Sequence, residues 1–345
     1  MNSPRHESQR TTLPDDLSQA FDRMVELGWT DGLPVIPPTP ERVAAMLAGT
    51  RRAPHEVIAE LAPSEGLATV EKIAINAVLA GCRPEYLPVL IAAVEALAQP
   101  QLNLLAIQTT TNPVAPFVLI NGPVRRRIDI NGGRGALGPG WRANATIGRA
   151  VRLIMQNIGG ARPAEIDKAV LGFPGKYTFC LGELEEESPW PPFHVEHGYA
   201  PEDSVVTIMA CQGTQSVAAS FLEPESILKM VTNGLAVWGT NSYNKGDGTP
   251  AVVLTPRHAA IFHEAHWDKR RIQEWLFEST KVPESELPAE PRLMGHHRNI
   301  VGACLCICKQ ASDIAILVAG GPEAYHIGLL ANYGNPMAMA RIDAL

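Results

Sequence analysis

The sequence predicts an α/β fold, with mixed α+β as a variant, built as two similar lobes of sheet with packed helices. Short apolar runs typical of strands alternate along the chain with amphipathic helical segments. Three strand-like runs end in an elbow that contains proline, at Phe117–Pro123, Val252–Pro256 and Ile316–Pro322. The first two follow a helix that opens with Pro-Glu, at Pro84 and Pro224. This repetition indicates an internal duplication; the alternative is chance, since apolar strands commonly stop at Gly and Pro.

Length, composition and charge bound the class of protein. With 345 residues, 46% of them hydrophobic, the chain can bury a large core. The formal charge is −7 and Lys and Arg are scattered, so we expect no nucleic-acid partner. We expect disorder over residues 1–13, an N-terminal α/β lobe over 14–200, and a C-terminal α/β lobe over 201–345.

The N-terminus and the cysteines bear on location. The first twelve residues are polar without an apolar signal segment, and no apolar run reaches membrane-spanning length. Six cysteines show no disulfide-framework spacing. We therefore predict a cytoplasmic protein with no membrane partner, and expect it to form a homo-oligomer.

The first half of the chain contains clear helix signals. Leu17–Leu27 is a predicted helix that stops at Gly28, and Thr39 with Pro40 opens a second one. Two further helices, Thr69–Gly81 and Pro84–Leu97, are joined by a short turn and predict a helical hairpin packed on a sheet.

A loop with five glycines runs straight into an amphipathic helix within Asp129–Arg149. The helical stripe comprises Ile147, Ala150, Val151, Ile154, Met155 and Ile158, and Asn144 is the predicted N-cap. Bare amides, a helix N-terminus and nearby arginines, among them Arg149 and Arg152, are typical of an anion site. The predicted binding residues are Asn131, Gly132, Gly133, Gly138, Gly140, Arg142, Asn144 and Thr146. The alternative is a purely structural turn.

The elbows add a second group of candidates. If the two lobes are real, a ligand is expected where their elbows meet, because pockets favour such junctions. Asn121, Gly320, Gly321, His258 and His326 would then face it.

The segment Gly175–Glu183 predicts a catalytic cysteine. If Tyr177–Leu181 is a strand, alternation places Lys176 and Cys180 on one face, where the ammonium would favour a thiolate nucleophile. Glu183 or His194 would carry the proton. The alternative is a buried structural cysteine.

Histidines and further cysteines offer weaker signals. His194 and His197 could bind a metal, with His326 as a third candidate, although the prolines around them favour a surface loop or a lid. The alternating Cys304, Cys306 and Cys308 are spaced too widely along a strand for one metal, so we expect them to pack as small apolar residues.

Four segments resemble a bacterial group of similar length that is sometimes labelled with the UGSC selenocysteine/cysteine family. They are Thr30–Thr39, Ala74–Tyr86, Gly135–Thr146 and Pro174–Cys180. The resemblance covers most of the chain and implies no particular reaction. The Cys-Gly-Ser-Cys form of that motif does not occur in this sequence.

Together these features predict an enzyme that acts on a small anionic metabolite, a carboxylate or a phosphate, by hydrolytic or lyase chemistry with Cys180 as nucleophile. One alternative is a metal-dependent enzyme that uses the histidines. Another is a non-catalytic metabolite-binding or assembly protein. The sequence does not identify a cofactor.

Overall fold

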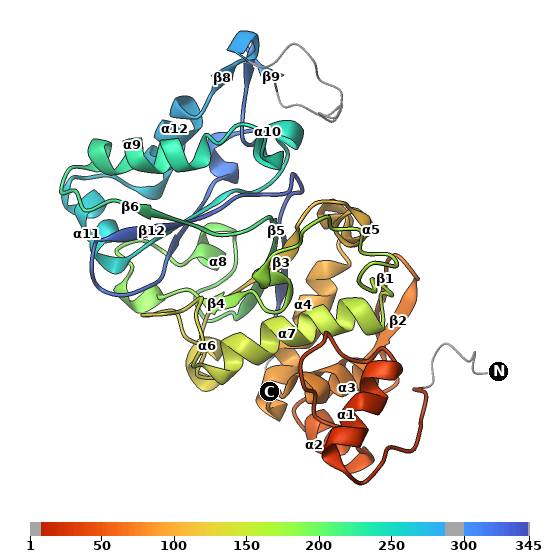
Figure 1. The fold of residues 1–345 in the computed structure, drawn as a ribbon. Helices are drawn as coiled ribbons and strands as arrows, with labels where there is room; N and C mark the ends of the chain where they lie inside the picture. Colours follow the sequence, from red (N-terminus) through yellow and green to blue (C-terminus); the bar gives the residue numbers. More distant parts are fainter. Residues whose placement is uncertain (1–7, 287–299, 344–345) are drawn as a thin grey trace.

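The computed structural model describes residues 8–286 and 300–343 and consists of four layers, helices, sheet, sheet and helices (Figure 1). The first sheet has the order β13-β5-β3-β4 and the second β11-β7-β12-β6. In the first sheet the strands are β13 (Ala338–Arg341), β5 (Val205–Cys211), β3 (Ala115–Asn121) and β4 (Cys180–Gly182). In the second they are β11 (Ala315–Val318), β7 (Ala251–Leu254), β12 (His326–Leu330) and β6 (Gln215–Ala218). The predicted α/β class is confirmed.

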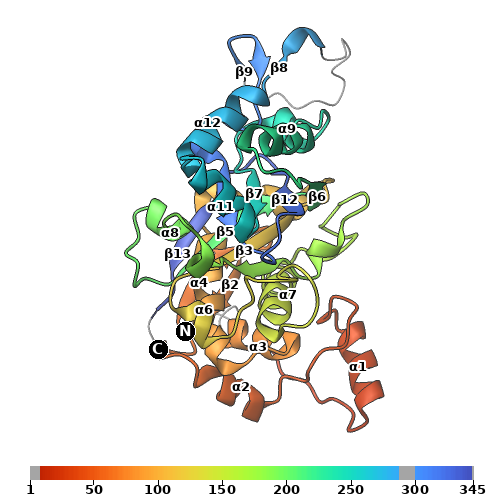
Figure 2. The same ribbon diagram turned by 90° about the vertical axis from the view of Figure 1, so that its left-hand side faces the viewer.

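Alternation along the strands creates three apolar cores. On β3, Val118 and Ile120 face the helices, whereas Phe117 and Leu119 face the second sheet. The outer core of the first sheet lies under α3 (Val70–Ala80), α4 (Leu87–Leu97) and α7 (Arg142–Asn157). The outer core of the second sheet lies under α9 (Pro224–Leu235), α11 (Pro256–Glu264) and α12 (Lys269–Ser279). Figure 2 shows these two groups of helices at opposite ends, with the strands between them.

The two sheets repeat one topology. In the first, β3 pairs parallel to β4 and antiparallel to β5, which pairs antiparallel to β13. In the second, β7 pairs parallel to β11 and antiparallel to β12, which pairs antiparallel to β6. Each repeat also begins with a helix opened by a Pro-Glu pair, which leads into α4 or forms α9. The predicted two similar lobes are therefore present in the connectivity.

The repeats exchange their last strands. After β5 the chain crosses to the second sheet and forms β6, and after β12 it crosses back and forms β13. The crossing segments lie against each other, since the Gln212 amide donates to Ala331 O and the Tyr333 amide to Ala210 O. The lobes consequently do not divide at residue 200: β5 and β13, both beyond it, belong to the first sheet. The expected boundary between 14–200 and 201–345 is wrong in this respect.

Local signals placed the early helices correctly. α1 (Leu17–Glu26) and α2 (Pro40–Leu47) form as predicted, and the Thr39 side chain accepts a hydrogen bond from the Arg42 amide. α3 ends at Gly81, whose positive φ of 88° suits a residue without Cβ. A hairpin of β1 (Val57–Leu61) and β2 (Gly66–Thr69) precedes α3.

Short elements complete the fold. They are α5 (Leu104–Thr109), α6 (Val124–Arg127), α8 (Phe193–Glu196), α10 (Asn241–Lys245), β8 (Val282–Pro283), β9 (Ile300–Val301) and β10 (Cys304–Leu305). The last three form a small separate sheet. Within residues 8–286 and 300–343 no single helix is long and apolar enough to cross a bilayer; only Pro84–Leu97 with Pro100–Thr109, bent by 70°, reaches that length and composition.

Several sequence predictions need correction. The expectation of disorder over residues 1–13 falls partly on residues 1–7, which lie outside the described residues; Ser8 donates to the Glu71 carboxylate and Leu13 packs against the first core. α7 begins at Arg142 with Trp141 as its N-cap, so Asn144 is not the cap. The predicted strand Tyr177–Leu181 forms only from Cys180, because residues 174–176 coil into a 3₁₀ turn.

Candidate functional site

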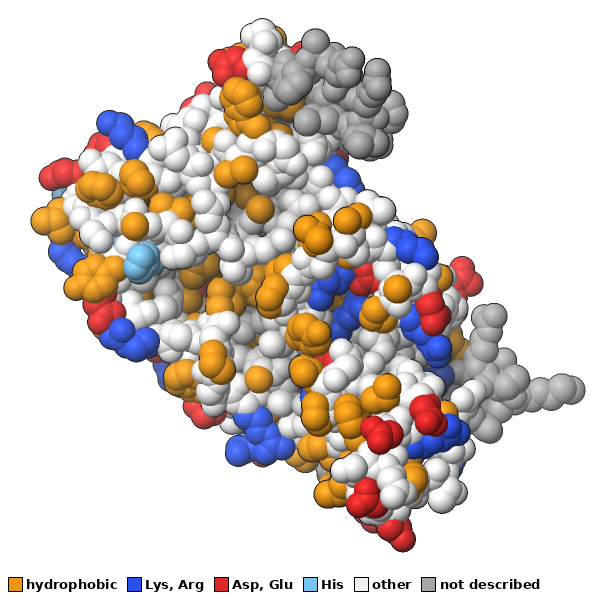
Figure 3. All heavy atoms as spheres, in the orientation of Figure 1, with side chains coloured by type: hydrophobic (Ala, Val, Ile, Leu, Met, Phe, Trp, Pro, Cys, Tyr) orange, Lys and Arg blue, Asp and Glu red, His pale blue; other side chains and the backbone are white. Residues whose placement is uncertain are grey.

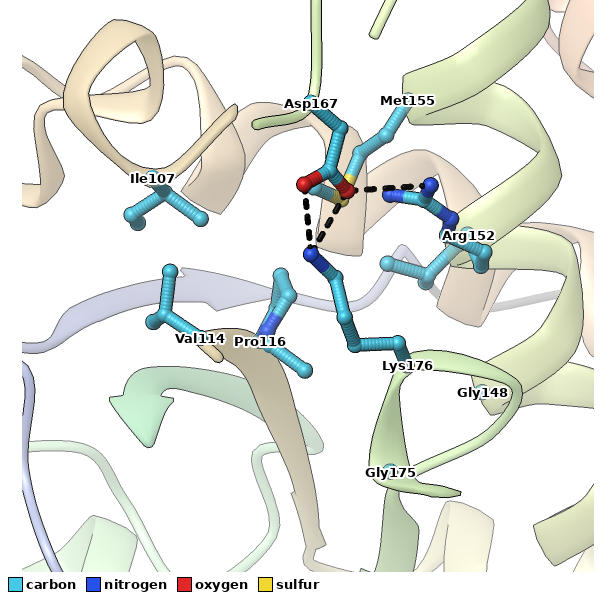
Figure 4. Close-up of a pocket in the computed structure, with 11 residues that line it drawn as sticks. Ile107, Val114, Pro116, Gly148, Arg152, Met155, Asp167, Gly175 and Lys176 are labelled. Atoms are coloured by element: carbon cyan, nitrogen blue, oxygen red, sulfur yellow. Dashed lines mark hydrogen bonds and ion pairs between the residues drawn. The ribbon is translucent and has the colours of Figure 1, made fainter. Parts of the chain in front are cut away.

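A small hollow lies between α7, the beginning of β3 and the loop that leads to β4 (Figure 4). Its volume is about 10 Å³, which is room for one water-sized group. It is lined by Ile107, Val114, Ala115, Pro116, Gly148, Val151, Arg152, Met155, Asp167, Gly175 and Lys176. The hollow therefore joins three charged side chains to an otherwise apolar or glycine lining.

Two cations share one carboxylate in this hollow. The Lys176 ammonium lies 2.6 Å from one Asp167 oxygen and 2.8 Å from the other. Arg152 donates through Nη2 to Asp167 over 3.2 Å. The side chains of Arg152, Asp167 and Lys176 are 11%, 7% and 15% exposed. Because Asp167 balances only one of the two cations, the group keeps one surplus positive charge.

The environment of Lys176 alters its acidity. Burial lowers the pKa of its ammonium below that of an ordinary lysine, and the charge of Arg152 lowers it further, while the hydrogen bond to Asp167 acts in the opposite direction. The ammonium consequently gives up its proton more readily than a solvated lysine does.

One turn earlier on α7, Arg149 forms a balanced pair. Its guanidinium donates to both oxygens of Asp31 over 2.9 Å and 2.8 Å, and the two side chains are 15% and 5% exposed. This pair has one cation and one carboxylate in a comparable environment. The surplus charge is therefore a property of the hollow and not of buried arginines on α7 in general.

A second charged cluster lies at the other end of β3, where the elbows meet. The Glu183 carboxylate is fully buried and accepts hydrogen bonds from the Asn121 side chain over 2.6 Å and from the Phe193 amide over 2.8 Å. Lys269 lies 3.9 Å from it and bonds to Glu196 over 2.9 Å. We call Asn121, Arg125, Glu183, Glu185 and Lys269 the elbow cluster.

Glu185 connects the rest of this cluster. It accepts hydrogen bonds from Asn121 and from the Gly122 amide and forms an ion pair with Arg125 over 2.8 Å. His194 is fully buried 3.9 Å from Glu185, and among the described residues neither of its ring nitrogens has a hydrogen-bond partner. The elbow cluster itself has two carboxylates and two cations, and further carboxylates, Glu186 and Glu196, bond to Arg125 and Lys269, so among the described residues the cluster has no surplus positive charge.

The predicted pairing of Lys176 with Cys180 is wrong. Lys176 belongs to the 3₁₀ turn and bonds to Asp167, so it does not share a strand face with the thiol. Cys180 is 4% exposed within the first core, and burial raises the pKa of its thiol well above the ordinary value. The thiolate that a nucleophile needs is disfavoured there. Of its predicted proton carriers, Glu183 belongs to the elbow cluster and His194 lies beside it, 3.9 Å from Glu185.

Several amides of the glycine-rich loop bond within the protein. Asn131 and Gly133 donate their amides to Asn144 and Asn131 side-chain oxygens, and the Gly138 amide donates to Gly135 O. The buried Asn144 amide group donates to Asn131 O, Ala136 O and Cys180 O. The amides of Asn131, Gly133 and Gly138 are therefore not available to an anion, because protein oxygens already accept their hydrogen bonds.

The other predicted binding residues separate. Gly132 and Gly320 meet at the elbows, where the Gly320 amide donates to Gly132 O over 2.8 Å, and Gly321 follows beside Arg134. Arg142 bonds to Gly81 O and Thr146 to Arg142 O at the start of α7, while Gly140 is exposed. The elbows do meet as predicted for Asn121 and Gly320, yet what they surround is a packed cluster.

The histidines proposed as metal ligands do not come together. Across residues 8–286 and 300–343 no group of three His, Cys, Asp or Glu side chains could hold a metal ion. His197 bonds to Phe193 O, and His326 is exposed on β12. His258 is buried between Thr255 and Ala219 O.

Comparison of the chain with protein-family models, curated proteins and solved structures gives no match. The functional argument therefore depends on the residues themselves. Sequence reasoning missed Asp167, Arg125 and Lys269, because no periodicity or spacing links them to their partners. Arg152 was noted only as positive charge near the glycine-rich loop.

Proposed function

We propose that the chain is an enzyme that acts on a small anionic metabolite bound in the hollow beside α7. The observation that carries this proposal is the surplus positive charge of Arg152 and Lys176 over Asp167 in a partly enclosed space. Buried charges are stable when they are paired, so one negative group of a ligand would complete the set. The predicted carboxylate or phosphate substrate fits this requirement.

Arg152 is the group that holds the substrate. It donates one hydrogen bond, to Asp167, among the described residues, so its other N–H groups are available to an oxyanion. Guanidinium binds carboxylate and phosphate with good geometry and remains charged at every relevant pH.

Lys176 is the group that moves a proton, a role that the sequence analysis predicted for Glu183 or His194. Its ammonium, with a lowered pKa, donates to the leaving group or carbanion that a lyase or hydrolytic step creates. Asp167 orients it through hydrogen bonds of 2.6 and 2.8 Å.

This role has a pH dependence of definite sign. Activity requires the ammonium form, so turnover is expected to fall as pH rises through the lowered pKa of Lys176, earlier than for an unperturbed lysine at 10.5. The chain would be incubated with a panel of carboxylic acids and phosphate esters, and consumption followed by mass spectrometry as a function of pH.

Variants separate binding from proton transfer. Lys176→Arg keeps the charge but cannot release a proton, so it should bind acetate and lose turnover, whereas Lys176→Met should lose both. Arg152→Met should weaken binding of acetate roughly tenfold or more, as the loss of a charge-assisted hydrogen bond predicts.

Arg149→Met is the matched control, because Arg149 forms a one-to-one ion pair with Asp31 and does not line the hollow. The shift in melting temperature on adding acetate or inorganic phosphate should be the same as for the unaltered chain. If neither anion stabilises the chain, or if Arg149→Met and Arg152→Met weaken binding equally, the proposal is wrong.

A further inference from the structure

Resting on the proposed function, we propose that the substrate is a monocarboxylic acid with an apolar body, and not a phosphate ester, a dicarboxylic acid or a sugar acid. The carboxylate would lie in the hollow at Arg152 and Lys176, and the apolar body would lie outside it, over the exposed loop that contains Val170 and Leu171.

The charge of the hollow favours a single negative charge. Arg152 and Lys176 exceed Asp167 by one positive charge, which one carboxylate neutralises. A phosphate ester carries about −1.5 to −2 near neutral pH and a dicarboxylate carries −2. Either would leave uncompensated negative charge beside Asp167, which is 7% exposed, and that is costly in a poorly solvated place.

The rest of the lining offers no polar side chain to a ligand. Arg152, Asp167 and Lys176 are the polar side chains that line the hollow; the other eight residues are apolar or glycine. Figure 4 shows Ile107, Val114 and Pro116 across from the charged group. A hydroxyl that entered the hollow would lose its water without a side-chain partner, and hydroxyls over the exposed apolar loop would bury no apolar surface of their own, which disfavours sugar acids.

An exposed apolar loop lies beside Lys176. Val170, Leu171 and Tyr177 are 77%, 93% and 49% exposed. Their loop is fixed near the hollow, since the Val170 amide donates to Thr111 O and a Cβ on Gly172 would lie 3.6 Å from the Lys176 stem. Figure 3 shows hydrophobic side chains, with Lys and Arg among them, on the surface between α5 and α7. Because the hollow holds only one water-sized group, the remainder of a ligand would contact this loop.

A homologous series of acids tests the inference. Dissociation constants of acetate, propionate, butyrate and hexanoate would be measured by titration calorimetry at constant ionic strength, with succinate and methylphosphonate for comparison. Affinity should rise about two- to fourfold for each added methylene, as burial of apolar surface predicts. Succinate and methylphosphonate should bind more weakly than butyrate and propionate, respectively.

Variants of the exposed loop localise the effect. Leu171→Ser should flatten the dependence on chain length and leave acetate binding unchanged, and Val170→Ser should do the same. Leu222→Ser, which alters a similarly exposed leucine in the segment between β6 and α9, is the matched control and should change neither.

The outcomes distinguish the inference from the function. Acetate binding without a rise along the series, or succinate binding as well as butyrate, overturns the monocarboxylate inference and leaves the anion-binding enzyme standing. A chain-length effect that Leu171→Ser and Val170→Ser do not change also overturns the inference. If none of the acids binds, the proposed function and the inference both fail.

Discussion

The two repeats share their connectivity but not their chemistry. Equivalent hydrogen bonds join the Glu183 amide to Ile120 O in the first repeat and the Ala319 amide to Leu254 O in the second. The register therefore makes Asn121 equivalent to Thr255, and Glu183 equivalent to Ala319. Asn121 and Glu183 belong to a cluster of buried charges. In the second repeat Thr255 caps α11, and Ala319 packs in the apolar core between the two sheets.

The helix before the parallel-paired edge strand of each sheet, β4 or β11, can be compared in the same way. α7, before β4, carries Arg149 and Arg152 into ion pairs that are mostly buried. α12, before β11, packs Ile272 and Leu276 into an apolar core, and its buried charge, Lys269, lies at the first residue of the helix beside Glu196. Because the second repeat folds to the same topology with an alanine, Ala319, at the position of Glu183, the fold does not require the buried carboxylate of the first. Buried ion pairs rarely add to stability, so this asymmetry points to function in the first repeat.

The largest expected effect comes from removing the carboxylate of the hollow. Asp167→Asn keeps the shape but leaves two buried cations without a counter-charge, so it should lower the free energy of unfolding by about 3–5 kcal/mol. Asp31→Asn strands only Arg149 and should cost less. Urea denaturation at constant ionic strength measures both.

The same pair of variants tests the charge surplus. Acetate should restore stability to Asp167→Asn more than to Asp31→Asn, because a bound anion replaces the missing carboxylate between two cations. Equal losses, together with equal responses to acetate, would show that the hollow is an ordinary buried ion pair.

Much of the architecture follows from local sequence, and the site does not. Thr39, Gly81 and the Pro-Glu helix openings act within a few residues, so their helices could be predicted. The exchange of β6 and β13 could not, because both strands are short and nothing in them specifies which sheet they join. The predicted start of α7 was too late in the chain. Asn144 is a residue type that often caps helices, but here its side chain joins the glycine-rich loop to β4.

The candidate site depends on contacts between residues without a shared pattern. Asp167 lies in an irregular loop and meets Arg152 and Lys176 only because the chain turns back against α7. The prediction of a Lys176–Cys180 pair failed because it assumed a strand where Pro174 and Gly175 start a 3₁₀ turn. The elbows were predicted to meet, and Asn121 and Glu183 do meet there, but their burial depends on the segment around Phe193.

Substitution of the equivalent elbow residues, Asn121 and Thr255, should change the free energy of unfolding by a smaller amount. Asn121→Ala removes hydrogen bonds to Glu183 and Glu185 and leaves buried carboxylate oxygens less satisfied, so it should cost about 2 kcal/mol. Thr255→Ala removes the cap of α11 and should cost about 1 kcal/mol. Thermal unfolding measures both, and a greater cost for Thr255→Ala would contradict the contrast between the elbows.

The smallest effect concerns cysteines at comparable depth in the two repeats. Cys180 and Cys308 are both buried, and burial raises the pKa of each thiol. Cys180→Ala and Cys308→Ala should each cost about 1 kcal/mol through lost packing and leave acetate binding unchanged. Iodoacetamide should modify the partly exposed Cys304 before either of them in the folded chain, as peptide mass spectrometry would report. Rapid modification of Cys180 that acetate prevents would instead place the reactive group at the thiol first predicted from the sequence. Since a buried neutral thiol lacks the charge that makes sulfur nucleophilic, we expect Cys180 to resemble Cys308 in its low reactivity.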